Sequence, residues 1–209
     1  MHTKYSPDGF MDVAEVIERA RAEGLSGIAI TDHNTCGAVN EALRIGKKEK
    51  FLVIPGVEVK SIRGDIIGLG ITTSPKKGMG VEDTIKKIHE LGGIAVAAHP
   101  YSILFHPCKM RGTVRTAGFD AIEVFNARTY VGNDGARRAA TDLGIPMTAG
   151  SDSHTASEIG SAYTVVECEE ADIKSVIDAI RKGKTSIVGR RATLGYIVGW
   201  YYQRLRRVF

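Results

Sequence analysis

Side chains that bind metals recur in this sequence, mostly where apolar segments end. Seven histidines and carboxylates lie near the start of the chain or at the carboxyl ends of apolar segments: His2, Asp8, His33, Glu58, His99, Asp152 and His154. Imidazole and carboxylate together suit zinc, manganese and iron, whereas magnesium and calcium favour sites made of oxygen ligands alone. Seven ligands exceed the needs of one ion and suit two or three, as in phosphatase and nuclease centres. Asp65 is a weaker eighth candidate.

Each of these residues also has an ordinary structural interpretation. Asp8 in SPDG is a common turn former, and Asp152 and His154 in SDSHT could be a helix N-cap and its neighbour. Their joint occurrence at corresponding segment ends is what favours a metal site. His89 lies within a helical pattern and is expected at the surface, whereas His106, in the irregular segment 101–118, is a candidate for substrate contact.

Basic side chains and one amide near the same segment ends could bind phosphate. The candidates are Arg63, Lys109, Arg111, Arg128 and Asn126. Arginine suits phosphate because its planar guanidinium donates two parallel hydrogen bonds. The alternative for each cation is a solvated surface charge, and Asn126 could instead cap a turn.

The pattern of apolar residues predicts alternating helices and strands. Helices are expected over 11–24, 37–50, 81–93, 133–144 and about 170–182, and strands over 25–33, 51–59, 65–71, 94–100, 119–126, 145–154, 162–168 and 185–191. Continuous apolar strands that alternate with helices indicate a parallel sheet covered on both faces. A closed barrel brings its strand ends into one ring, whereas an open sheet has a single crevice, so a barrel fits these residues better. Because eight βα units take about 250 residues, we expect a reduced or distorted barrel.

Composition and charge limit the class of protein. No apolar run reaches the length of a membrane span, no secretory signal opens the chain, and three scattered cysteines fit a cytoplasmic location. The net charge of +4 comes from residues 190–209, which hold five arginines and no acid. The other residues carry 23 basic and 24 acidic groups. This balance does not favour nucleic acid as a partner of the body of the protein.

The segment 191–209 is expected to form a basic, aromatic helix at the carboxyl end. Leu194, Tyr201 and Leu205 fall on one helical stripe. Packing on the barrel is the main interpretation of this stripe. A homodimer surface and peripheral membrane contact are the alternatives.

Four motifs, in their order and spacing, resemble the PHP (polymerase and histidinol phosphatase) superfamily. They are TDH at 31–33, PGVE at 55–58, AHP at 98–100 and GSDSH at 150–154, and the opening HTKYSPDG resembles the end of the family's first motif. The similarity spans about residues 1–165. It implies a distorted seven-stranded (β/α) barrel over residues 1–190, TIM-like, with parallel strands and a di- or trinuclear metal centre at their carboxyl ends.

The resemblance also implies roles for individual residues. His2, Glu58 and Asp152 would hold one metal, and Glu58 would bridge to a second that His99 also holds. Asp8, His33 and His154 would hold a third, with Asp32 orienting His33. Glu58, Asp152 and His154 are the residues expected to be central to catalysis.

The sequence departs from the family pattern at two positions. The family's first motif reads His-x-His, but Met1 stands at the x. We expect that the sequence starts a few residues late and that the first metal position is incomplete, with weakened occupancy and activity. Asp65 stands where relatives often have histidine, which favours manganese, iron or magnesium over zinc.

The expected function is hydrolysis of a phosphomonoester, in a small metabolite or nucleotide, by a metal-activated water. A nuclease acting on nucleic-acid ends is the alternative within the enzyme class. A barrel without catalysis that serves as a scaffold for RNA or protein is the alternative outside that class. Convergent carboxylates argue against a scaffold, which does not need them.

Overall fold

The computed structural model describes residues 1–103 and 108–191. His106, and all but the first residue of the helix expected over 191–209, therefore lie outside the described residues. No helix within the described ranges is long and apolar enough to cross a membrane.

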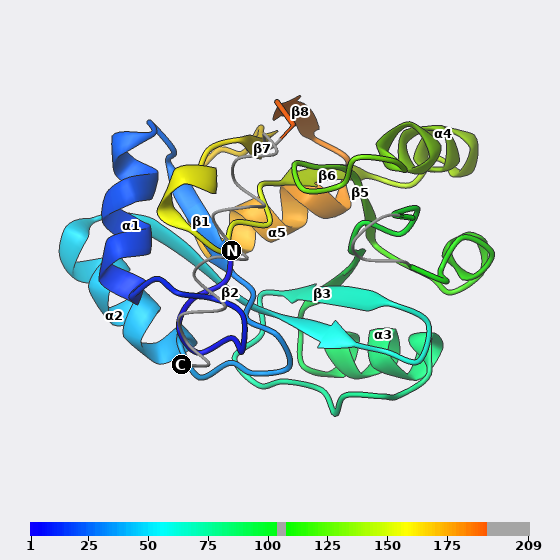
Figure 1. Ribbon diagram of the computed structural model, residues 1–209, viewed down its shortest axis with the longest axis horizontal. Coiled ribbons are helices and arrows are strands. Elements are labelled where there is room, and N and C mark those ends of the chain that lie inside the picture. Colours follow the sequence, from blue (N-terminus) through cyan, green and yellow to red (C-terminus); the bar gives the residue numbers. More distant parts are fainter. Residues whose placement is uncertain (104–107, 192–209) are drawn as a thin grey trace, which may run out of the picture.

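The described chain forms five α-helices and eight strands (Figure 1). The helices are α1 (Val13–Ala22), α2 (Val39–Glu49), α3 (Val81–Glu90), α4 (Asn133–Leu143) and α5 (Ile173–Arg181). The strands are β1 (Gly27–Ile30), β2 (Leu52–Lys60), β3 (Asp65–Leu69), β4 (Ile94–Ala97), β5 (Ala121–Asn126), β6 (Met147–Gly150), β7 (Ala162–Val166) and β8 (Thr185–Gly189). Every helix and strand expected within these ranges is present, and His89 is exposed on α3 as predicted.

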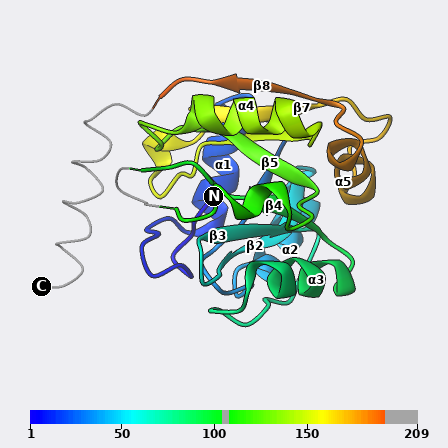
Figure 2. The same cartoon turned by 90° about the vertical axis from the view of Figure 1, so that its right-hand side faces the viewer.

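Strands β1 to β6 form one curled sheet in sequence order, and β7 and β8 form a separate antiparallel pair. The α/β class and its barrel-like curvature are thus as predicted. The expectation of parallel strands throughout is wrong at β3, which runs antiparallel to both β2 and β4. The reason is the short link at residues 61–64, because a parallel crossover needs a dozen or more residues. The pair β7–β8 lies beside β6, where the Thr164 hydroxyl bonds both backbone groups of Ala149. Figure 2 shows the same pair above β5.

Side chains alternate between the two faces of the sheet, so each face has its own packed apolar layer. Polar side chains gather at one end of the sheet. On β2, Val57 packs outward under the helices, whereas Ile54 and Glu58 face inward. Helices α2, α3 and α4 cover the outer face (Figure 1), and α5 packs Ile177 and Ile180 against the inner face near the start of β4. Apolar side chains thus fill the inner face around α5, and polar side chains gather at the opposite, carboxyl end of β2.

Candidate metal centre

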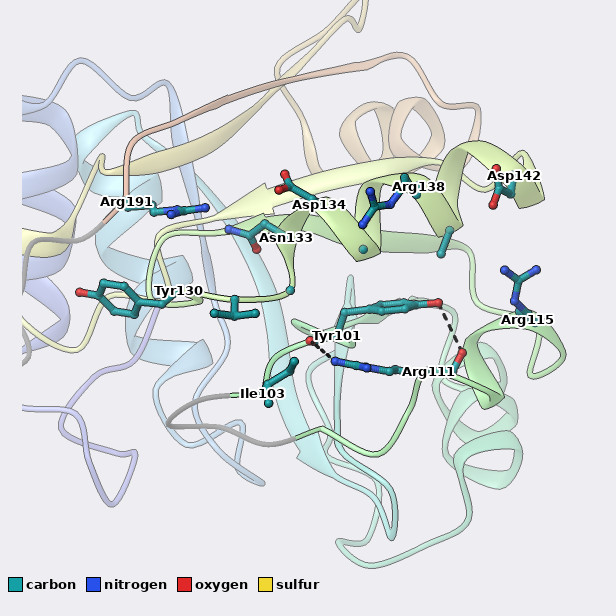
Figure 3. Close-up of a pocket in the computed structure, with 14 residues that line it drawn as sticks. Tyr101, Ile103, Arg111, Arg115, Tyr130, Asn133, Asp134, Arg138, Asp142 and Arg191 are labelled. Atoms are coloured by element: carbon teal, nitrogen blue, oxygen red, sulfur yellow. Dashed lines mark hydrogen bonds between the residues drawn. The ribbon is translucent and has the colours of Figure 1, made fainter.

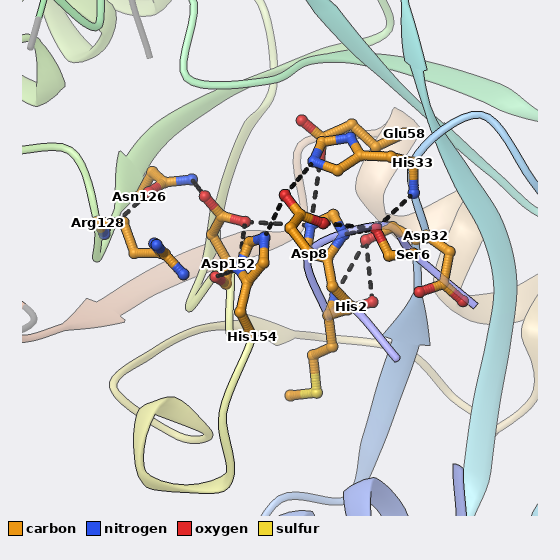
Figure 4. Close-up of polar contacts among 12 residues, drawn as sticks. His2, Ser6, Asp8, Asp32, His33, Glu58, Asn126, Arg128, Asp152 and His154 are labelled. Atoms are coloured by element: carbon orange, nitrogen blue, oxygen red, sulfur yellow. Dashed lines mark hydrogen bonds and ion pairs between the residues drawn. The ribbon is translucent and has the colours of Figure 1, made fainter. Parts of the chain in front are cut away.

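Ligand-type side chains converge where β1, β2, β4 and β6 end (Figure 4). They form three groups, each with potential ligand atoms within 4.8 Å of one another: His2, Asp8, His33 and His154; His2, Glu58 and Asp152; and Glu58, Asp65 and His99. The structure therefore brings together all eight side chains that the sequence pointed to as ligands. His2 and Glu58 each belong to two groups, so the three groups form one continuous cluster.

Glu58 lies at the middle of this cluster. Its Oε2 is 3.2 Å from His2 Nε2, and its Oε1 is 3.2 Å from His99 Nε2. His2 Nε2 is also 3.1 Å from Asp152 Oδ1. Because the two Glu58 oxygens face different histidines, this carboxylate is arranged as a bridge between two of the groups.

Asp8 joins the remaining two histidines. Its Oδ2 lies 3.5 Å from His33 Nε2 and 3.3 Å from His154 Nε2. Ser6 holds Asp8 in turn, because the Ser6 hydroxyl donates to Asp8 Oδ1 at 2.8 Å. The turn-forming segment SPDG thus positions a carboxylate within the cluster.

The segment that carries His2 is fixed along β1. The Met1 amino group donates to Ala29 O at 3.1 Å, and Thr31 N donates to Met1 O at 3.0 Å. Both oxygens of Asp32 accept from Thr3, at 2.6 Å from its backbone N–H and 2.8 Å from its hydroxyl. The prediction that Asp32 orients His33 was therefore wrong. Consecutive residues of an extended chain point to opposite sides, so Asp32 faces the amino-terminal segment instead.

Two of the ligand-type residues have backbone conformations that are rare for residues other than glycine. The φ angle is 31° at His99 and 51° at Asp152. Such conformations cost about 1–3 kcal/mol each and persist only where the surroundings impose them. Glu123 imposes the conformation of His99, because the His99 N–H donates to Glu123 Oε2 at 2.8 Å. Asn126 links the two positions, because its amide donates to Glu123 Oε2 at 3.1 Å and to Asp152 Oδ2 at 3.3 Å.

Glu158 organises the loop that carries Asp152 and His154. Its Oε2 accepts hydrogen bonds from His154 N–H, Thr155 N–H and the Thr155 hydroxyl. Its Oε1 lies 3.3 Å from Arg128 Nη1, and both side chains are buried. Sequence reasoning missed Glu158, although the spacing Thr-x-x-Glu at 155–158 is a capping-box signal.

Replacing Glu158 with glutamine is expected to lower the free energy of unfolding by about 3–5 kcal/mol, because an amide would face the buried Arg128 guanidinium. The melting temperature should fall by about 6–20 °C, which thermal denaturation measures, and metal content should fall with it. Glu15→Gln, on the exposed face of α1, is the matched control. Equal stability of the two variants would show that the Arg128–Glu158 pair does not hold this loop.

The proposed phosphate-binding residues fall into buried and exposed sets. Arg128 and Asn126 are buried on the same side of Asp152 (Figure 4). Arg63 and Lys109 are exposed neighbours, with Lys109 N–H donating to Arg63 O at 2.9 Å. Arg111 lies over the Tyr101 ring, 5.7 Å from its centroid. Sequence reasoning missed another cation, Lys60, whose Nζ is 3.4 Å from Asp65 Oδ2.

Burial and contacts between histidines and carboxylates shift the pKa values in this cluster. Burial opposes the charge on His2 and His99, but hydrogen bonds with Asp152 and Glu58 outweigh burial at His2, raising its pKa to about 9. Glu58 likewise raises the pKa of His99 to about 10. Burial also opposes the charge on Glu58 and Asp152, yet the facing histidines hold both carboxyl pKa values well below the usual range. Burial raises the pKa of Glu123 to about 7.

The donor set fits divalent metals. Four histidines and four carboxylates share the cluster, a mixture that suits zinc, manganese and iron. Asp65 Oδ1 is buried and has no hydrogen-bond partner among the described residues, which is costly for an oxygen without a ligand. Burial and Glu58 raise the pKa of Asp65, so a cation there would relieve the repulsion between these two carboxylates.

Comparisons with known proteins agree with this geometry. A family model described as PHP domain matches residues 1–108, and one described as PHP-associated matches residues 132–185. MJ1587, an uncharacterized protein of Methanocaldococcus jannaschii, is 37% identical over 138 residues, which cover 61% of this chain and 79% of that protein.

Two solved structures are similar in fold. One is a two-domain protein from Bacteroides vulgatus described as containing a predicted PHP-like metal-dependent phosphoesterase. It has a TM-score of 0.76 and 16% identity, over 97% of this chain and 67% of its own. The other is Endonuclease Q, in complex with a 27-mer duplex substrate with an abasic lesion at the active site. It has a TM-score of 0.65 and 14% identity, over 96% of this chain and 65% of its own. At these identities the similarity establishes the fold.

Proposed function

The chain belongs to the PHP domain family, and from that premise we propose that it is a metal-dependent phosphoesterase that hydrolyses the phosphomonoester of a small metabolite or nucleotide. The observation that carries the proposal is the continuous cluster of eight ligand-type side chains, joined through His2 and Glu58. A structural role would not require four buried or half-buried carboxylates to converge on four histidines.

The three groups suggest which residues hold which ion. His2, Glu58 and Asp152 would hold one metal, Glu58, Asp65 and His99 a second, and Asp8, His33 and His154 a third, with His2 also in reach. Bound divalent metals lower the pKa of water from 15.7 to about 7 and stabilise charge on phosphoryl oxygens. Two carboxylates and one imidazole at the Asp65 group favour manganese, iron or magnesium there, with zinc as the alternative.

The chain's own residues supply orientation and charge. Glu58 and Asp152 remain ionised at neutral pH because the facing histidines lower their pKa values. Glu123 and Asn126 fix the positions of His99 and Asp152. Buried Arg128 presents positive charge beside Asp152. Exposed Arg63 and Lys109 are further candidates to bind phosphate oxygens.

Purification without chelator, followed by metal analysis and assay with an aryl phosphate, tests this function. We expect at least two metals per chain and turnover that chelation lowers by about 100-fold or more and that manganese restores. Less than one metal per chain with no turnover would favour the scaffold alternative. Turnover of an aryl phosphodiester but not of the monoester would favour the nuclease.

A further inference from the structure

Lys60, at the end of β2, contacts one of the ligand-type carboxylates of the metal centre. Its Nζ lies 3.4 Å from Asp65 Oδ2. Other basic side chains gather around a separate pocket beside α4, where Figure 3 shows Arg111, Arg115, Arg138 and Arg191. None of the residues that line that pocket is a candidate metal ligand. A role at the metal centre is therefore better supported for Lys60 than for these arginines.

The antiparallel pairing of β2 with β3 places Lys60 beside Asp65. The two residues are direct partners in the strand register, two positions along from the pair Glu58 and Ile67. Side chains two positions apart on a strand point to the same face, so Lys60 points to the same side of β2 as Glu58. Direct cross-strand partners have Cβ atoms about 4.5–5.5 Å apart. The sheet itself therefore holds the lysine against the carboxylate.

Hydrogen bonds fix the backbone of both partners. Lys60 N–H donates to Asn34 Oδ1 at 2.8 Å. Asp65 O accepts from Ala98 N–H at 3.2 Å, directly before His99. The Lys60 side chain is 66% exposed, whereas that of Asp65 is 9% exposed. A largely exposed lysine thus faces a buried carboxylate from a fixed position on the sheet.

The two oxygens of Asp65 have different surroundings. Oδ2 faces the Lys60 ammonium. Oδ1 is buried and has no hydrogen-bond partner within residues 1–103 and 108–191. One oxygen is therefore available to a metal while the other is held by the lysine.

The charge on Lys60 persists when metal binds, unlike the charges that face the other carboxylates. Glu58, Asp8 and Asp152 pair with histidines, and imidazole binds a metal only in its neutral form. An ammonium has three donors and no lone pair, so Lys60 cannot become a ligand while it is charged. A metal held by Asp65 would therefore lie near one fixed positive charge, and like charges repel.

We propose that Lys60 sets the affinity for metal of the group formed by Glu58, Asp65 and His99. Its ammonium offsets the charge of Asp65, so the pair supplies an oxygen ligand with no net charge. Without the lysine, the same oxygen would carry its full charge and hold a divalent ion more tightly. The inference rests on the proposed metal-dependent function and gives Lys60 the role of keeping the ion at this group exchangeable.

Calorimetric titration of the chelated protein with manganese at pH 8 tests the proposal. Lys60→Met removes the charge and keeps an unbranched side chain. We expect it to tighten the binding of one ion per chain by about tenfold, while the affinity for the other ions changes less than about threefold. Lys60→Arg, which keeps the charge, should bind manganese as the wild type does. Lys86→Met, on the exposed face of α3, is the matched control and should change none of the affinities.

A second background shows whether the effect acts through Asp65. In Asp65→His the ammonium loses the carboxylate that holds it, so adding Lys60→Met should change the affinity less than about twofold. An equal gain in both backgrounds would overturn the proposal. Unchanged or weaker binding in Lys60→Met would also overturn it, because removing a lysine that only positions Asp65 lowers the affinity.

Two further measurements separate this proposal from other failures. Circular dichroism of each variant shows whether it is folded before titration. Aryl phosphate turnover by the wild type reports on the phosphoesterase function alone, whereas the affinities report on Lys60. The function and the proposal can therefore fail separately.

Discussion

Replacing Glu58 with glutamine is expected to remove at least half of the bound metal and to slow aryl phosphate hydrolysis by a factor on the order of 100 or more. Loss of residues that merely support a ligand already costs roughly 10–100-fold in metal affinity or activity. Replacing Glu58 should lower metal affinity and activity more than this, because its two oxygens face His2 and His99 at 3.2 Å each and it belongs to two ligand groups. Elemental analysis and steady-state kinetics measure the two losses.

The same variant should also unfold more readily without metal. Glutamine carries no charge, so the buried, protonated rings of His2 and His99 would lose the carboxylate they share. Breaking a buried ion pair in this way costs about 3–5 kcal/mol. Glu90→Gln, on the exposed face of α3, is the matched control, since Glu90 pairs with Lys87 at the surface. Full metal content in Glu58→Gln would show that this carboxylate is not a bridging ligand.

Much of the fold follows from local periodicity. The apolar positions Val13, Val16, Ile17 and Ala20 predicted α1, and all four are buried. The direction of β3 could not be predicted in the same way, because a strand that is buried on both faces has the same apolar pattern in either orientation. The four-residue link before β3 was the available signal, since such a link permits a hairpin but no crossover.

The candidate ligands were predictable because most of them directly follow a strand or lie in a short motif. The residues that hold these ligands in position were not predictable, since they lie far from the ligands in the sequence. Glu123 holds His99 from 24 positions away, and Asp32 holds Thr3 from 29 positions away. Such bonds depend on strand register and side-chain direction, which a single sequence does not encode locally. The positive φ angles at His99 and Asp152 belong to this class, because the surrounding hydrogen bonds impose them.

Binding of metal is expected to release close to two protons per chain at pH 7–8. Metals bind neutral imidazole, but without metal the pKa values of His2 and His99 are about 9 and about 10, so both rings start protonated. The apparent affinity for metal should therefore rise with pH, up to about 100-fold per pH unit for two protons, until these pKa values are reached. Calorimetric titration of the chelated protein with manganese, in two buffers of different ionisation enthalpy, measures the protons released.

The stability of the chelated protein should change with pH in the opposite direction. Both histidine pKa values are raised above the ordinary 6.5, so the stabilisation from their ion pairs is complete below about pH 6.5. It is lost as the pH rises through 9 to 10, where the folded rings give up their protons. Thermal denaturation should thus show a lower melting temperature at pH 9.5 than at pH 6.5 for the chelated protein, and a smaller difference for the metal-loaded one.

Variants of the two histidines test the release of protons on metal binding. His2→Asn and His99→Asn should each remove about one released proton, whereas His89→Asn, outside the cluster, should remove none. Proton release near zero in the wild type would mean that these two rings do not meet the metal.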